Sequence, residues 1–176
     1  VWCDVNGKTR LDMVSKVTDK TYLDILKNNT DMPELNHPYR IQYMPKSGYS
    51  DSPFYLLTAD GATRLSKNGF GWQKNYSFKY EVATQADLHP QSIVCDYSGM
   101  MRIFVSGGQA YYAQNMGIQG LFAAANKQPV LAPYVGAPIG VMAYASIYLL
   151  YDTVNKCFMS CCPLLPALGL SDVAYH

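Results

Sequence analysis

Three hairpin-like segments recur along the chain at a nearly constant spacing. Each joins an apolar or aromatic run to a tight-turn sequence and then to a second run: FYLLTADGATRL (54–65), RIFVSGGQAYY (102–112) and IYLLYDTVNKCFMS (147–160). Their turns, at Asp60-Gly61, Gly107-Gly108 and 153–155, lie about 46–48 residues apart. Glycine and asparagine suit such turns, because the favoured hairpin turns need positive φ. The chain is therefore predicted to consist of similar β units.

Two shorter matches extend the pattern toward the N-terminus. CDVNG (3–7) and CDYSG (95–99) lie 92 residues apart, which is twice 46, and NGKTRL (6–11) resembles DGATRL (60–65). Several matches with one spacing favour a repeat over coincidence. A repeat of this length with about four short strands is typical of a β-propeller.

The predicted elements surround these hairpins. Strands are expected at residues 39–44, 54–58, 62–66, 76–82, 92–96, 101–106, 109–113, 141–151 and 156–161. One helix is predicted at 19–28 (DKTYLDILKN), with Thr18 as its N-cap and apolar side chains on one face.

The predicted fold class is all-β, built from antiparallel four-stranded repeats of about 46 residues and resembling a β-propeller. At about 40–50 residues per blade, a chain of 176 residues holds fewer than four full blades, so it forms a small ring or part of a larger one. An irregular β-sandwich is the structural alternative. We treat residues 1–176 as a single β domain and expect it to be part of a larger chain.

Composition narrows the classes of partner. Apolar residues make up 49% and charged residues 15%, which excludes intrinsic disorder. The net charge is +1, which disfavours nucleic-acid binding, because that affinity rests on basic charge. Residues 129–151 carry no charge, but three prolines and two glycines in this stretch favour short buried strands over a transmembrane span.

No catalytic or metal-binding constellation is evident in the sequence. The five cysteines form no C-x-x-C pair, and His37 and His89 each precede a proline in a predicted loop. We therefore expect no catalytic residue, no metal and no cofactor. Asp4, Asp60, Asp96 and Asp152 lie beside predicted turns, where an aspartate ordinarily bonds its own backbone. Convergence of two such acids is left open, so a propeller-type glycosidase or polysaccharide lyase is the alternative function.

The loop NGFGWQKNY (68–76) carries the candidate ligand-binding residues. It places Phe70, Trp72 and Tyr76 among glycines and amides such as Asn75. One interpretation is an aromatic cluster packed beneath the loop. The other is an exposed surface on which sugar rings stack, with amides bonding the hydroxyl groups.

The third hairpin also carries a family resemblance. IYLLYDTVNKCFMS, preceded by LAPYVG (131–136) and by LLTADG and FVSGGQAYY upstream, resembles the Bacteroidetes surface lipoproteins that carry a PKD-like region. The similarity covers roughly residues 54–160, and Cys157 stands where members commonly have a basic residue. The resemblance implies a propeller-like C-terminal region and no established catalysis.

The same resemblance implies an extracytoplasmic protein. It would lie at the cell surface, on the outer membrane or in the periplasm, lipid-anchored through a removed N-terminal part, beside systems for nutrient uptake. The expected function is that of a non-enzymatic binding or scaffold module for a glycan or protein partner. The remainder of the parent chain is a further expected partner.

Overall fold

The computed structural model describes residues 2–44, 48–96, 98–99, 101–115, 120–124, 131–135, 138–142, 145–161 and 170–172. No α-helix occurs among these residues. The strands are β1 (Trp2–Val5), β2 (Lys8–Leu11), β3 (Met13–Ser15), β4 (Lys20–Tyr22), β5 (Pro38–Tyr43), β6 (Phe54–Thr58), β7 (Gly61–Leu65), β8 (Ile93–Cys95), β9 (Met101–Ser106), β10 (Gln109–Gln114), β11 (Ala123–Ala124), β12 (Pro138–Met142), β13 (Ala145–Asp152), β14 (Cys157–Cys161) and β15 (Leu170–Asp172). Three short 3-10 turns occur at Ile25–Asn28, Lys74–Tyr76 and Phe78–Glu81.

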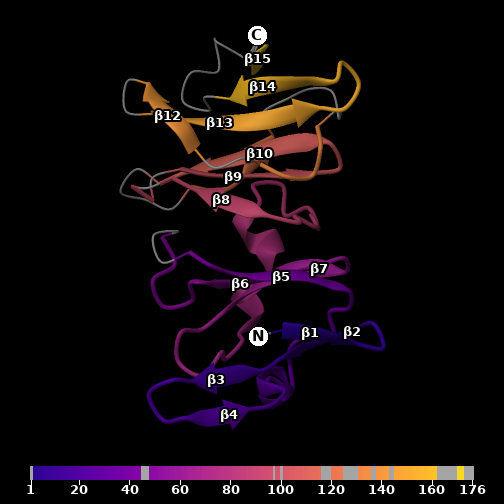
Figure 1. The fold of residues 1–176 in the computed structure, drawn as a ribbon, viewed down its shortest axis with the longest axis vertical. Coiled ribbons are helices and arrows are strands. Elements are labelled where there is room, and N and C mark those ends of the chain that lie inside the picture. The colour runs from indigo at the N-terminus through magenta and orange to yellow at the C-terminus, as the bar shows by residue number, and fades with distance from the viewer. Residues whose placement is uncertain are drawn as a thin grey trace.

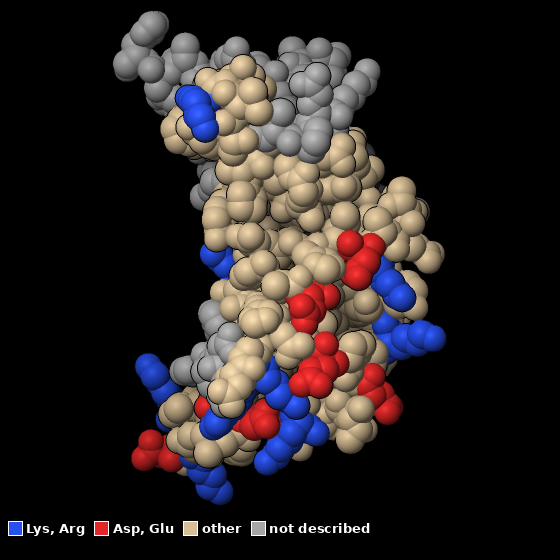
Figure 2. All heavy atoms as spheres, turned by 90° about the vertical axis from the view of Figure 1, so that its right-hand side faces the viewer, with Lys and Arg blue, Asp and Glu red and all other residues tan. Residues whose placement is uncertain are grey.

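The strands form antiparallel sheets in which neighbours in space are also neighbours in sequence. The sheets are β1-β2, β3-β4, β5-β6-β7, β8 to β11 and β12 to β15. They are arranged along the long axis of the molecule, with β3-β4 at one end, then β1-β2, β5-β6-β7 and β8 to β11, and β12 to β15 at the other end (Figure 1). Figure 2 shows that this column is bent. None of the described sheets closes on itself, and the prediction of an all-β antiparallel chain is confirmed.

The predicted hairpins agree well with the observed ones. The strands expected at 54–58 and 101–106 are β6 and β9 with the same bounds. The turn between β9 and β10 has φ of 56° at Gly107 and 78° at Gly108, the positive values that a two-residue hairpin turn needs. The strand expected at 141–151 is instead divided between β12 and β13, and residues 143–144 lie outside the described part of the chain.

The helix predicted at 19–28 is wrong. Its first half forms β4, which pairs with β3, and only Ile25–Asn28 makes a 3-10 turn. Asp24, between the two, has a left-handed backbone with φ of 49°, and its N–H donates to Asp12 Oδ1 at 2.8 Å. A non-local hydrogen bond and a left-handed residue therefore override the helical pattern.

The strand predicted at 76–82 is also wrong. This segment forms the second and third 3-10 turns, and it buries Phe78, Glu81 and Val82. Residues three apart eclipse in a 3-10 turn, so Phe78 and Glu81 point the same way, into the molecule. An alternating pattern read as a strand is in this case a turn fixed by tertiary contacts.

The core lies between successive sheets and repeats with the predicted spacing. Tyr55 and Leu57 of β6 pack with Phe104 of β9, whereas Met101 and Ile103 of β9 pack with Tyr148 and Leu150 of β13. Three of the core positions lie at intervals of 46 residues: Leu56, Arg102 and Tyr148. Each of these side chains faces the sheet that precedes its own. The central strands β6 and β9 are thus buried on both faces, as expected of sheets packed in a column.

The connections between sheets repeat as well. The His37 N–H donates to Gly7 O at 2.7 Å, and the His37 carbonyl accepts from the Ala59 N–H at 3.0 Å, so this residue joins the β1-β2 turn to the β6-β7 turn. In each such connection, one of the residues that make these contacts directly precedes a proline in the sequence. The corresponding contacts are His89 Nδ1–H to Ala59 O (2.6 Å), His89 N–H to Ser106 Oγ (3.3 Å), Leu131 N–H to Gly108 O (3.0 Å) and Ala132 N–H to Tyr151 O (2.9 Å).

Candidate functional site

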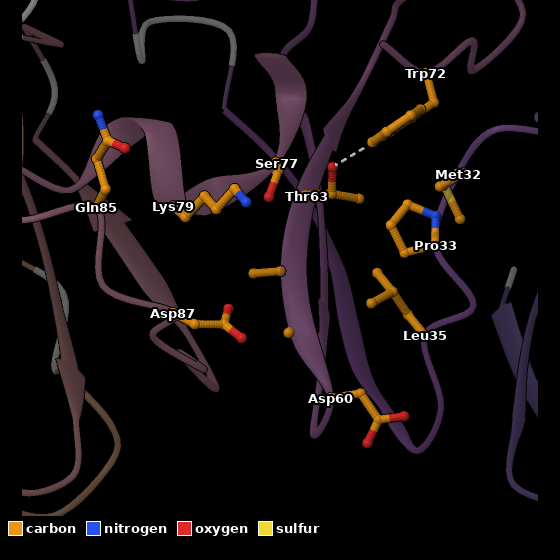
Figure 3. Close-up of a pocket in the computed structure, with 12 residues that line it drawn as sticks. Met32, Pro33, Leu35, Asp60, Thr63, Trp72, Ser77, Lys79, Gln85 and Asp87 are labelled. Carbon is orange, nitrogen blue, oxygen red and sulfur yellow. Dashed lines mark hydrogen bonds between the residues drawn. The ribbon is translucent and has the colours of Figure 1, made fainter. Parts of the chain in front are cut away.

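A groove lies beside β7, where three separate segments meet around Trp72. Its first part is a pocket of about 350 Å³. Figure 3 shows the strand that carries Thr63 between two walls, with the loop at Met32, Pro33 and Leu35 on one side and Lys79, Gln85 and Asp87 on the other. A second pocket of about 600 Å³ shares Pro33, Trp72, Ser77 and Lys79 with the first. We call the two together the Trp72 groove.

Trp72 is fixed in this groove by hydrogen bonds at both its backbone and its ring. The Trp72 N–H donates to Asn29 Oδ1 at 2.8 Å, and the indole Nε1–H donates to Thr63 Oγ1 at 2.8 Å (Figure 3). The Asn29 amide in turn donates to Phe70 O at 3.0 Å. One asparagine side chain therefore holds the loop at two points, and the half-buried indole has a defined orientation.

Two residues near the groove have strained backbones. Phe70 has φ of 58° and Gln85 has φ of 53°, a left-handed conformation that is rare for non-glycine residues and costs roughly 1–2 kcal/mol. Such residues persist only where surrounding contacts impose them, and they concentrate at functional sites. Phe70 lies two residues before Trp72, and Gln85 lines the first pocket.

Polar and charged side chains line the same pocket as Trp72. Asp60 Oδ2 accepts from the Asn36 N–H at 3.0 Å, and Asp87 lies 3.5 Å from His89 Nε2. The ammonium group of Lys79 lies 5.3 Å from the centre of the Tyr80 ring. The groove therefore offers carboxylate, ammonium, amide and hydroxyl groups in a pocket that an aromatic ring also lines, a combination suited to a polar ligand with apolar ring faces.

The acids of the groove lie in water. Asp60 and Asp87 are both exposed, and the side chain of Asp87 is 77% exposed. A carboxyl group that acts as a general acid near neutral pH needs burial or a like charge to raise its pKa. Among the described residues, no cluster of three metal-ligating side chains occurs.

The four residues that the sequence suggested as ligand-binding do not all lie in one site. Trp72 lines the groove, whereas Phe70 packs on Phe54 with ring centres 4.9 Å apart and lines a different, smaller cavity. Tyr76 is 6% exposed, with the Arg64 guanidinium 4.8 Å from its ring centre. Asn75 is exposed, and its carbonyl accepts from Arg64 Nη2 at 3.0 Å.

The aromatic loop is therefore partly packed against the core, and the interpretation of a sugar-stacking surface stays a prediction for Trp72. Phe70 and one side of Trp72 pack against the cluster that contains Leu11, Leu56 and Leu65, while Trp72 also contributes to the groove wall. The sequence did not reveal Asn29, which bonds the Trp72 backbone, or the groove residues Thr63, Lys79, Gln85 and Asp87. No local pattern marks them, because only the tertiary fold brings them to the same site as Trp72.

A buried charge cluster supports one wall of the groove. Glu81 Oε1 lies 2.8 Å from Arg64 Nε in an ion pair, and Glu81 Oε2 accepts hydrogen bonds from Arg102 Nη1 at 2.6 Å and from the Tyr55 hydroxyl at 2.9 Å. Glu81 and Arg102 are fully buried and Arg64 is 4% exposed. Because Glu81 ends the 3-10 turn that also carries Lys79, this cluster fixes the turn against two sheets.

Burial governs the protonation of this cluster. It raises the pKa of Glu81 above the ordinary value, while the two guanidinium groups and the Tyr55 hydroxyl act in the opposite direction. Burial and the nearby Glu81 charge raise the pKa of Tyr49 to about 12. Because of this raised pKa, the Tyr49 phenol stays neutral at physiological pH. Its ring covers Arg64, whose guanidinium carbon lies 3.5 Å from the ring centre.

Comparisons with known proteins give no relative. No protein-family model matches the chain, and no curated protein or solved structure shows significant similarity to it. Within the part of the chain that the structure describes, no helix is long and apolar enough to cross a membrane. The functional inference therefore rests on the geometry of the Trp72 groove.

Proposed function

We propose that this chain is a non-enzymatic binding module that takes a glycan into the Trp72 groove. The observation that carries the proposal is Trp72 in the wall of a polar pocket, with its backbone N–H bonded to Asn29 and its indole Nε1–H bonded to Thr63. An aromatic ring fixed in advance loses little conformational entropy when a ligand stacks on it. Sugar rings combine an apolar face of C–H groups with polar hydroxyl edges. The apolar face matches the aromatic ring, and the hydroxyl groups match the polar side chains of the pocket.

The side chains around the indole suit hydroxyl groups better than a single strong charge. The groove carries the carboxylates of Asp31, Asp60 and Asp87 and the ammonium groups of Lys74 and Lys79. Charges of both signs lie close together, so no strong field of one sign favours a polyanion or a polycation. A neutral or weakly charged glycan meets both donors and acceptors there.

A glycosidase or polysaccharide lyase is the second candidate function. Asp60 and Asp87 favour it, because they come from different segments and line one pocket. Their exposure to solvent favours binding instead. Incubating the bound polysaccharide with the protein distinguishes the two: new reducing or unsaturated ends that disappear in the Asp87→Asn variant would establish an enzyme.

The whole chain is proposed to be propeller-like and extracytoplasmic. Support for a propeller comes from chain-consecutive antiparallel sheets, two of them four-stranded, and from core positions repeating every 46 residues. Support for a surface or periplasmic location comes from the resemblance to Bacteroidetes lipoproteins with a PKD-like region. A glycan-binding groove fits a role in nutrient uptake, in which the module captures or presents polysaccharide.

Affinity electrophoresis through gels that contain soluble polysaccharides tests the proposal. The panel would include xylan, mannan, mixed-linkage glucan, starch, pectin and mucin. We expect at least one to retard the native chain, and Trp72→Ala to weaken binding by about thirtyfold, the equivalent of roughly 2 kcal/mol for a central aromatic contact. Tyr134→Ala, at an exposed tyrosine outside the groove, is the matched control and should bind normally.

The same experiment can contradict the proposal. Unchanged mobility of the native chain across the panel, or equal retardation of native chain and Trp72→Ala, would overturn it. Because Trp72 also packs on the core, Lys79→Ala provides a second variant at an exposed residue. It should weaken binding without lowering the thermal unfolding midpoint.

A further inference from the structure

We propose that Trp72 stands between two subsites of one groove, and that the ligand is a glycan chain of at least two sugar units rather than a single sugar. This inference rests on the proposed function, because it concerns the same groove. It adds the length of the ligand and the division of the groove into two ends.

The two pockets adjoin each other at Trp72. They share Pro33, Trp72, Ser77 and Lys79, and their volumes of about 350 and 600 Å³ each fall within the usual range for a small-molecule site. A ligand confined to one pocket would leave the other open beside the same side chains. A chain that crosses Trp72 uses both.

Each end of the groove has its own set of polar groups. The first end has the carboxylates of Asp60 and Asp87 and the amide of Gln85. The second end has the amide of Gln73 and the phenol of Tyr80. Both ends therefore have groups that accept and donate hydrogen bonds, as two sugar units in succession require.

Tyr80 provides a second aromatic ring along the path. It lines the second pocket and is partly buried, with the Lys79 ammonium 5.3 Å from its ring centre. Two aromatic rings in one groove allow two sugar rings to pack, one at Trp72 and one beyond it. The shared side chain between them is Lys79, which lines both pockets.

Two anchors hold the shared part of the groove in place. Trp72 is held by Asn29 and Thr63, and the turn that carries Lys79 ends at the buried Glu81. Side chains that are fixed before binding lose less entropy on binding. A rigid centre with a polar set at either end is the arrangement expected of a site that holds consecutive units of a chain.

The test is a length series of oligosaccharides prepared from the polysaccharide that retards the protein, with affinities measured by calorimetry. We expect affinity to rise by about tenfold or more from the monosaccharide to the tetrasaccharide, as a second subsite is filled. Asp87→Ala alters only the first end and Gln73→Ala only the second; both residues are exposed. Each variant should weaken tetrasaccharide binding at least threefold, whereas Lys67→Ala, outside both pockets, should not.

The outcomes separate this inference from the proposed function. Equal affinity for the monosaccharide and the tetrasaccharide would overturn the two-subsite inference and leave glycan binding intact. Tetrasaccharide binding that is weakened in one of the two end variants and unchanged in the other would also overturn the two-subsite inference and leave glycan binding intact. Failure of every sugar in the series to bind would overturn both.

Discussion

Glu81 forms ion pairs with guanidinium groups from two neighbouring sheets: Arg64 on β7 and Arg102 on β9. Two buried cations and one buried carboxylate leave a formal charge of +1, and removing these groups from water is costly. The sequence could not reveal this cluster, because Glu81 lies 17 and 21 residues from its partners and no local pattern links them. At the residue scale, the fold depends on non-local contacts that composition alone does not show.

Replacing Glu81 by glutamine should therefore strongly destabilise the protein. The variant leaves two buried guanidinium groups without a compensating charge, and breaking a buried ion pair in this way costs about 3–5 kcal/mol. Urea unfolding followed by circular dichroism measures the change. Glu34→Gln is the control, because the Glu34–Lys8 pair is exposed on both sides and should contribute less than about 1 kcal/mol. Equal stability of the two variants would contradict a structural role for the cluster.

Asp152 should make stability depend on pH. Its carboxylate accepts from the backbone N–H and side-chain amide of Asn155, each at 2.9 Å, and from the Val154 N–H at 2.8 Å. Hydrogen bonds from Asn155 and Val154 lower the pKa of Asp152 although burial opposes them. The stabilisation is then present above the unfolded value of about 3.9 and is lost as pH falls through the lower folded pKa.

The measurement is the thermal midpoint of native chain and Asp152→Asn across pH. We expect the native chain to exceed the variant most at neutral pH, with the difference shrinking as pH falls below about 4. Asp19→Asn, at an exposed turn residue, should differ little from the native chain throughout. A difference for Asp152→Asn that grows on acidification would show the opposite sign of linkage.

Elements whose conformation is set by local chemistry were the most predictable. The turn at Gly107-Gly108 needs two residues at positive φ, and the sequence supplies two glycines there. Residues 19–28 and 76–82 carry patterns for a helix and a strand, but Asp24 and Glu81 instead form contacts with distant residues. In the groove, the sequence could nominate Trp72 as an aromatic in a glycine-rich loop, whereas Asn29, which orients it, lies 43 residues away.

Gly107→Ala isolates the contribution of backbone conformation in a hairpin turn. A Cβ at Gly107 would meet no atom within 4 Å, yet φ is 56°, so the cost arises from the left-handed backbone alone. We expect the free energy of unfolding to fall by about 1 kcal/mol. Gly71→Ala is the control, since a Cβ there makes only ordinary contacts at 3.9–4.0 Å and should change stability by less than about 0.5 kcal/mol. Equal stability of the two variants would contradict the assigned turn.

At the scale of the whole molecule, charge is unevenly distributed along the column of sheets. Residues 1–96 carry 22 of the 27 charged side chains, and residues 97–176 carry 5. Figure 2 shows the coloured charges gathered over the N-terminal part of the column. The Trp72 groove lies in this charged half, at a junction of segments from residues 31–87. The near-neutral net charge of the sequence conceals this asymmetry, and the column of sheets turns it into a difference in charge between the two ends of the molecule.

The most direct test of glycan binding at Trp72 is the indole N–H resonance of that residue. The chain has two tryptophans, Trp2 and Trp72, so a ¹⁵N–¹H correlation spectrum contains two indole signals, and Trp2→Phe assigns them. On titration with an oligosaccharide from the retarding polysaccharide, we expect the Trp72 signal to shift in a saturable manner while that of Trp2 stays in place. A saturating titration that leaves the Trp72 signal unmoved, or moves only that of Trp2, would contradict the proposed site.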